Sequence, residues 1–352
     1  MTRIHLLALP NVQTTREYSL DGFAAATIRF AKLLKSLNYH VILYGSEENE
    51  APCDEFVSCI SKAEQRAGLG ASPYQYASIN ECHVLWQTAN PRMIAEIGKR
   101  KQPRDFICTI GGASQKPVAD AHPDLMCVEY SIGYIGSFSK YRVFESSVWR
   151  HVTYGAQHIQ DGRFFDTVIP LFFEPSDFIY CKQPGDYFLY VGRLVERKGI
   201  GIACAAAKAA GVPLKVIGHG NTNLITYGHY LGALSWGERN QWMSNARAVF
   251  CPTQYIEPFG CTAVEAQFGG TPVISTDWGG YVETVVQGVT GFRCTYLGEF
   301  VDAVRKVGTL NREFISARAS RDYSISALAP QYDRYFKRLN LLWGDGWHSL
   351  SV

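Results

Sequence analysis

Two glutamates separated by seven residues, Glu257 and Glu265, flank the predicted start of a helix that follows a strand over residues 248–250. The first N–H groups of a helix have no partner inside it, and the helix dipole favours negative charge there. These groups therefore form a predicted site for phosphate or sugar oxygens. Because Glu257 precedes the helix and Glu265 lies about two turns along it, the carboxylates are placed to bind different ends of one elongated anionic ligand. The N–H groups concerned belong to Phe259, Gly260, Cys261 and Thr262.

A cationic loop is predicted upstream of these glutamates. A strand-like run over residues 187–191 ends at Gly192 and Arg193, and Lys198 opens the next helix-like segment. In parallel α/β sheets, ligands bind beyond the carboxyl ends of the strands, so cations in this loop are expected near the ligand. The alternative is that Arg193 and Lys198 form a surface charge pair. His219 follows another predicted strand, where it either lines the same site or is an ordinary loop histidine.

Three glycine-rich runs follow the two glutamates, at residues 269–276, 279–283 and 288–292. In this order and spacing, the whole stretch resembles the donor-binding half of the GT-B glycosyltransferases. Within them it is most similar to the retaining family 4 enzymes with their Glu-x7-Glu motif. The resemblance is strong over residues 187–294 and loose over residues 1–45.

The resemblance implies a role for each candidate residue. Arg193 and Lys198 would bind the diphosphate of a nucleotide-sugar donor. Glu265 would accept hydrogen bonds from the ribose hydroxyls and Glu257 from the sugar hydroxyls, although Glu265 is otherwise interpreted as an exposed helix acid. The full set of expected donor-binding residues is Gly192, Arg193, Lys198, His219, Glu257, Phe259, Gly260, Cys261, Thr262 and Glu265.

The implied reaction is transfer of a sugar, with retention of configuration, from a UDP- or GDP-linked donor to a hydroxyl group of an unidentified acceptor. The departing diphosphate gains negative charge, so the site needs cations or a metal ion. No Asp-x-Asp sequence occurs in the chain. We therefore expect no metal and no cofactor, with Arg193 and Lys198 supplying the charge. The candidate catalytic residues are Glu257, Arg193, Lys198 and Glu129.

The sequence indicates the residues on the acceptor side less clearly than those on the donor side. Family members usually have a glycine-rich turn after the first strand, and the nearest match here is Asp21 with Gly22. Asp21 suits the N-cap of the following helix equally well. Many relatives place a histidine at the end of a later strand, where this chain has Glu129. That carboxylate is either a polar group beside the reacting sugar or a strand-end acid that is buried and paired or merely exposed.

Alternating strand-like and helix-like segments predict an α/β protein with doubly wound parallel sheets. At 352 residues and 47% apolar content, the chain has enough apolar side chains for two cores. The resemblance implies a GT-B fold, in which two Rossmann-like domains face a cleft. We expect an acceptor-binding domain over residues 1–175, a donor-binding domain over 176–330, and a helix over 331–352 that crosses back to the first domain. Residues 84–87 and 151–154 are among the predicted strands.

Charge and cysteine content weigh against several other classes. The formal net charge is +2, which gives no general attraction to nucleic acid or to anionic membranes. The short basic run at residues 99–101 is either a solvated helix end or a polyanion contact. Ten cysteines form no Cys-x-x-Cys pair and no zinc-type spacing, as is usual in a reducing compartment. The apolar run over residues 4–9 is too short for a signal-peptide core. We expect a soluble cytoplasmic protein, with peripheral membrane attachment left open.

Other functions fit part of the pattern. A GT-B-shaped nucleotide-sugar epimerase needs paired acid and base groups for proton transfer at the sugar, and no such pair is evident. A non-catalytic module that binds nucleotide sugars or glycans would keep the fold but lose the cationic loop or one glutamate. A dinucleotide oxidoreductase ranks last, because the turns at residues 111–114 and 218–220 lack the Gly-x-Gly-x-x-Gly spacing.

Overall fold

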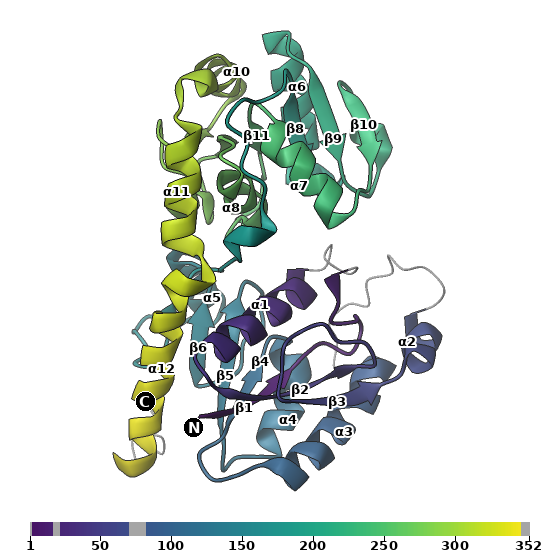
Figure 1. The fold of residues 1–352 in the computed structure, drawn as a ribbon, viewed down its shortest axis with the longest axis vertical. Coiled ribbons are helices and arrows are strands. Elements are labelled where there is room, and N and C mark those ends of the chain that lie inside the picture. Colours follow the sequence, from purple (N-terminus) through teal and green to yellow (C-terminus); the bar gives the residue numbers. More distant parts are fainter. Residues whose placement is uncertain (1, 17–21, 70–81, 346–352) are drawn as a thin grey trace. The chain divides into compact units, whose positions relative to one another are not determined.

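The computed structural model describes residues 2–16, 22–69 and 82–345 (Figure 1). Within it the chain divides into two compact units, each built on one parallel sheet. Two helices, α5 (Ser147–Ala156) and α12 (Ile325–Asp345), begin with residues of unit 2 and continue in unit 1. Unit 1 comprises Met1–Glu145, Arg150–Pro170 and Leu328–Val352, and unit 2 comprises Ser146–Trp149 and Leu171–Ala327.

The sheet of unit 1 has the strand order β3-β2-β1-β4-β5-β6-β7. Its central strands are short, apolar and buried, as expected for a parallel sheet that is covered on both faces. In the pairing of β1 with β2, Arg3 lies opposite His40 and Leu7 opposite Tyr44. The strands are β1 (Arg3–Leu7), β2 (His40–Ser46), β3 (Glu55–Ile60), β4 (Phe106–Thr109), β5 (Met126–Ile132), β6 (Tyr141–Phe144) and β7 (Thr167–Val168).

Helices cover both faces of this sheet. On one face, Trp86 of α3 (Val84–Arg100) packs in a buried cluster with Ile107 of β4. On the other face, the ring of Phe30 stacks on Tyr130 of β5 with 4.0 Å between the centroids, and Tyr332 of α12 lies 5.0 Å from Phe30. The remaining helices of this unit are α1 (Gly22–Ser36), which carries Phe30, α2 (Lys62–Leu69) and α4 (Lys116–Asp120).

The sheet of unit 2 has the strand order β10-β9-β8-β11-β12-β13. Successive side chains of a strand point to opposite faces, so Phe188 of β8 joins one buried cluster and Leu189 joins the other. The first cluster contains residues of α6 and α10, and the second contains residues of α7 and α8. The strands are β8 (Phe188–Val191), β9 (Leu214–Ile217), β10 (His229–Gly232), β11 (Val249–Cys251), β12 (Val273–Thr276) and β13 (Gly291–Cys294). The helices are α6 (Ile200–Ala210), α7 (Trp236–Asn245), α8 (Cys261–Phe268), α9 (Tyr281–Thr284), α10 (Leu297–Lys306) and α11 (Arg312–Tyr323).

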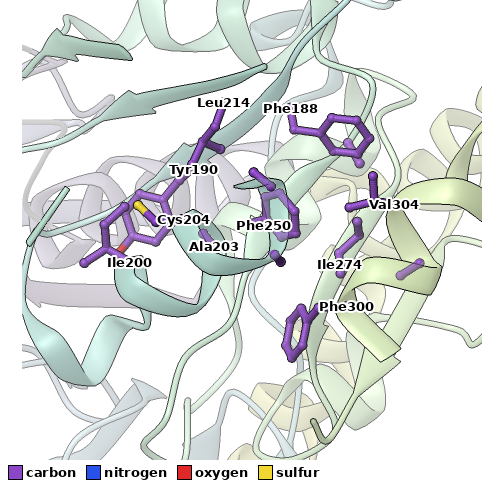
Figure 2. Close-up of a cluster of buried hydrophobic side chains, with 14 of the residues drawn as sticks. Phe188, Tyr190, Ile200, Ala203, Cys204, Leu214, Phe250, Ile274, Phe300 and Val304 are labelled. Atoms are coloured by element: carbon purple, nitrogen blue, oxygen red, sulfur yellow. The ribbon is translucent and has the colours of Figure 1, made fainter. Parts of the chain in front are cut away.

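Figure 2 shows the first of these two clusters. Phe250 of β11 and Ile274 of β12 lie opposite Phe300 and Val304 of α10, and Cys204 of α6 lies beside Tyr190. Complete burial of a large apolar side chain stabilises a fold by about 1.5–3 kcal/mol. This core therefore fixes the positions of the strands whose carboxyl ends carry the candidate residues.

Two predicted strands are helical in the structure. Residues 84–87 form the start of α3, where the side chain of the N-cap His83 accepts a hydrogen bond from the N–H of Leu85. Residues 151–154 lie inside α5. A short apolar run does not distinguish a buried strand from one turn of a helix, and in α3 the deciding pattern lies further along the chain. Its buried apolar residues recur at helical spacing, at Leu85, Ala89, Met93 and Ile97.

Candidate functional site

Helix α8 begins at Cys261, two residues later than the sequence predicted. Its N-cap is Gly260, whose φ of 91° and ψ of 56° lie in the left-handed region. A Cβ atom at this position would lie 2.5 Å from Cε1 of Tyr281, so glycine is required both for its conformation and for its size. Among the described residues, none accepts a hydrogen bond from the N–H of Gly260 or Thr262. The start of α8 therefore keeps two backbone donors for a ligand.

Lys198 and Glu257 form an ion pair at the site. The Nζ atom of Lys198 lies 2.7 Å from Oε2 of Glu257, and the two side chains are 20% and 13% exposed. Nζ also lies 4.9 Å from the ring centroid of Tyr255. Burial alone would lower the pKa of Lys198, but the nearby Glu257 and Tyr255 more than offset it, so this pKa is raised. Lys198 is therefore positively charged at neutral pH.

The loop that carries Lys198 is held by a close backbone contact. Gly199 follows it with a φ of 77°, and a Cβ atom there would lie 1.9 Å from the carbonyl oxygen of Pro252. The hydroxyl of Tyr190 lies 3.0 Å from the carbonyl oxygen of Arg193 and 3.3 Å from that of Lys198. These contacts fix the cationic loop beside the carboxyl end of β11.

The backbone of Glu257 is held by the second glycine-rich run, because the N–H of Gly280 donates to its carbonyl oxygen at 2.6 Å. Both glutamates affect the pKa of the Cys251 thiol at the end of β11. Burial raises the pKa of Cys251 to about 12, with Glu257 and Glu265 adding to the rise and Lys198 opposing it. Helix α8, which carries Glu265, packs through Ala263 against Cys251 at this strand end.

Glu265 pairs with a residue that the sequence analysis did not single out. The Nη2 atom of Arg239 lies 3.1 Å from Oε2 of Glu265, and the two side chains are 14% and 9% exposed. Glu265 is therefore not an exposed helix acid. Arg239 lies on α7, whose start is marked by a capping box between Ser235 and Glu238. That signal predicts the helix, but nothing in one sequence indicates that this part of α7 meets α8.

The ends of β8 and β9 place three further candidates near one another. The N–H of Gly192 donates to the carbonyl oxygen of Ile217 at 3.1 Å, and the N–H of Leu194 donates to that of His219 at 2.7 Å. Burial and the positive charge of Arg193 both lower the pKa of His219. His219 therefore favours its neutral form beside Arg193, and a role in donor binding stays a prediction.

Two candidates at the start of α8 have structural side chains. The ring of Phe259 is buried and packs edge-on against Tyr323 with 5.8 Å between the centroids. Cys261 packs against the buried cluster that contains Phe259 and Tyr323. Any contact of Phe259 with a donor would therefore use its backbone. Thr262 is partly exposed.

Glu129 is completely buried, and it lies in the middle of β5 rather than at a strand end. Its Oε2 accepts hydrogen bonds from the N–H groups of Phe138 and Ser139 at 2.8 Å and 2.7 Å, and its Oε1 lies 3.2 Å from the hydroxyl of Tyr134. Burial raises the pKa of Glu129 to about 7, although these hydrogen bonds oppose the rise. The structure thus agrees with the buried, paired alternative, and a catalytic role stays a prediction.

The predicted turn on the acceptor side is only partly visible. Asp21 lies outside the described residues. Gly22 is the first residue of α1, and its position has open space for a side chain. A requirement for glycine at this position is therefore not evident, and the contact of this turn with an acceptor stays a prediction.

Comparison with known proteins covers the region that contains the candidate donor-binding residues. Residues 180–311 match the family model of the glycosyl transferases group 1. Glycogen synthase of Mycobacterium tuberculosis (strain ATCC 25618 / H37Rv) is 33% identical over 122 residues, which cover 30% of this chain and 29% of that protein. An uncharacterized glycosyltransferase of Methanocaldococcus jannaschii is 30% identical over 126 residues, which cover 33% of this chain and 36% of that protein. The matches thus span about a third of the length of these relatives.

Solved structures resemble nearly the whole chain. AviGT4, a glycosyltransferase involved in avilamycin A biosynthesis, superimposes with a TM-score of 0.70 at 16% identity, covering 96% of this chain and 98% of that one. Anabaena HepE in complex with UDP-glucose gives a TM-score of 0.67 at 16% identity, with coverage of 96% and 100%. The chain therefore has the GT-B fold that the sequence predicted, with two Rossmann-like parallel sheets.

Two further properties concern the described residues alone. None of the helices in that part of the chain is both long enough and apolar enough to cross a membrane. No three histidine, cysteine, aspartate or glutamate side chains in it are grouped so that they would hold a metal ion.

Proposed function

We propose that this chain is a retaining glycosyltransferase that moves a sugar from a UDP- or GDP-linked donor to a hydroxyl group, in the assembly of a glycan or glycoconjugate. One observation carries the proposal: the Lys198–Glu257 pair lies beside the end of β11, and α8, which carries Glu265, packs against the same strand. A diphosphate needs cations and backbone donors, while ribose and sugar hydroxyls need acceptors, and this strand end offers both. HepE, which has the same fold and was solved with UDP-glucose, supports the choice of donor.

In the proposed reaction, the bond between the anomeric carbon and the diphosphate oxygen breaks. Lys198, Arg193 and the backbone donors at the start of α8 stabilise the negative charge that grows on the diphosphate. The acceptor oxygen forms its bond to the anomeric carbon on the same face, and its proton passes to an oxygen of the departing diphosphate. Glu257 accepts hydrogen bonds from the sugar hydroxyls, and Glu265 accepts them from the ribose.

We propose unit 1 as the acceptor-binding part, with Asp21 and Gly22 as its candidate acceptor-side residues and Glu129 as a candidate catalytic residue. The support is the resemblance of the first residues to the family, together with the shared fold. The acceptor itself stays unidentified.

We further propose that catalysis needs no metal ion, because the side chains of Lys198 and Arg193 supply positive charge at the diphosphate. The absence of an Asp-x-Asp sequence supports this choice. Activity should persist in EDTA, measured as release of nucleoside diphosphate from the donor. Complete loss in EDTA with recovery on adding manganese would contradict the proposal.

A thermal-shift panel of UDP-, GDP- and ADP-sugars tests the donor assignment. At a hundred times its dissociation constant, a true donor adds about 2.7 kcal/mol to the free energy of unfolding, which gives a measurable shift. Product analysis then separates the alternatives. A glycosyltransferase releases nucleoside diphosphate, an epimerase changes the sugar without releasing it, and a binding module does neither. A panel without any shift would contradict the proposed function.

A further inference from the structure

Two arginines of unit 2 differ in the number of hydrogen bonds that their guanidinium groups donate. The largely buried guanidinium of Arg312 makes hydrogen bonds of 2.5–3.0 Å to three backbone carbonyl oxygens and to the hydroxyl of Thr271. The guanidinium of Arg239 makes one hydrogen bond within the described residues, to Oε2 of Glu265 at 3.1 Å. Its Nε atom is buried and has no partner in that part of the chain. Arg312 therefore acts as a structural bridge, whereas Arg239 contacts a single carboxylate oxygen.

Only one oxygen of the Glu265 carboxylate accepts a hydrogen bond from the described residues. Oε2 accepts the hydrogen bond from Arg239, while Oε1 accepts none from any described residue. A carboxylate oxygen has two lone pairs, so Oε1 keeps its full capacity to accept hydrogen bonds. Glu265 is largely buried, and its helix α8 packs through Ala263 against Cys251 at the end of β11, so a ligand bound at this strand end is the natural donor to this oxygen.

Arg239 itself is placed by the fold. The capping box of Ser235 and Glu238 fixes the first turn of α7, and the N–H of Arg239 donates to the carbonyl oxygen of Ser235 at 2.9 Å. The guanidinium therefore approaches Glu265 from a separate helix. A hydrogen bond from a charged group to one oxygen restricts rotation of the carboxylate, and so sets the direction in which the other oxygen points.

We propose that Arg239 is a positioning residue that holds Oε2 of Glu265, so that Oε1 accepts the ribose hydroxyls of the donor. The inference rests on the proposed function and deepens it, because it makes the site selective for ribonucleotides. Loss of Arg239 leaves a largely buried carboxylate without its partner and without a fixed direction. The ribose hydroxyls then lose their acceptor, while the diphosphate contacts with Lys198 and Arg193 remain.

Calorimetric titrations of the full chain with UDP and GDP, and with their 2′,3′-dideoxy analogues, test the inference. The nucleotide that binds more tightly is used with wild type, Arg239→Met and Arg239→Lys. Wild type should prefer the ribonucleotide by about ten- to a hundredfold, the worth of one hydrogen bond to a charged group. In Arg239→Met this preference should fall to within about threefold, with the affinity for the dideoxy analogue nearly unchanged. Arg239→Lys should restore part of the preference.

Arg247→Met is the matched control, because Arg247 lies just beyond α7 and forms a largely exposed pair with Asp186 at 3.3 Å. It should keep the wild-type preference. Equal weakening of both ligands in Arg239→Met would show a structural role and overturn the inference, as would an unchanged preference. Absence of nucleotide binding by wild type would instead overturn the proposed function, and the inference with it.

Discussion

Lys198 contacts the carboxylate of Glu257 at 2.7 Å. At the proposed site it also binds the diphosphate of the donor. Replacing Lys198 or Arg193 with alanine removes one charge-assisted contact to the diphosphate. Each change should weaken nucleoside-diphosphate binding by about ten- to a hundredfold in calorimetry. Lys208→Ala is the control, because Lys208 is exposed in α6 of the same unit. Unchanged affinity in both folded variants would remove these residues from the site.

The two glutamates should divide the donor between them. Glu265→Gln should weaken the intact donor and the free nucleoside diphosphate alike, because both contain the ribose. Glu257→Gln should leave diphosphate affinity nearly unchanged and lower kcat, since a hydrogen bond that strengthens as charge develops on the sugar acts on turnover. Calorimetry and initial rates measure the two effects. Equal loss of diphosphate affinity in both variants, with turnover of bound donor unaffected, would contradict this division.

Glu129 should make stability depend on pH. Its pKa rises from an ordinary 4.5 to about 7 in the folded chain, which corresponds to on the order of 3 kcal/mol. As the pH rises through this window, the unfolded chain loses a proton that the folded chain keeps, so the free energy of unfolding falls. Glu129→Gln keeps an oxygen for the N–H groups of Phe138 and Ser139 and an amide for Tyr134, but it does not titrate.

Thermal unfolding at about pH 5 and about pH 8 tests this expectation. Wild type should lose more stability between the two values than Glu129→Gln does. Parallel changes in the two proteins would show that Glu129 does not titrate in this range.

At the scale of elements, the site depends on the close contact between the turn at Gly199 and the end of β11. Gly199→Ala combines an unfavourable φ with overlap of the carbonyl oxygen of Pro252, so it should destabilise the protein by at least about 2 kcal/mol. It should also weaken nucleoside-diphosphate binding, because Lys198 precedes this turn. Gly201, within α6, has open space around it, and Gly201→Ala should be neutral or stabilising by up to about 1 kcal/mol. Denaturant unfolding compares the two, and equal stability would contradict the contact.

An element was predicted correctly where its sequence pattern is complete within a short segment. The strand β8 was predictable because a continuous apolar run ends at Gly192, and Glu257 was placed correctly before the helix. The strand expected at residues 84–87 was wrong because the period that shows α3 appears only over the whole helix. Arg239 was missed because its contact with Glu265 depends on the packing of α7 near α8. The sequence of neither helix indicates this packing.

At the scale of the whole molecule, the alternation of strands and helices was enough to predict two parallel sheets. The strand order was not predictable from this alternation, because parallel strands joined by helices can be placed on either side of the first strand. In unit 2, for example, β11 lies between β8 and β12, which brings the loop of Lys198 beside that of Glu257. The site therefore results from topology as much as from its motif.

The most direct test of glycosyl transfer is a proton NMR time course of the donor that gives the largest thermal shift, with wild-type protein, EDTA and water or simple sugars as acceptors. The proposed function predicts that nucleoside diphosphate and transferred or free sugar appear together, and that the first sugar product has the anomeric configuration of the donor. A donor that binds but yields no nucleoside diphosphate would contradict catalysis. A first product with the opposite configuration would contradict the retaining mechanism.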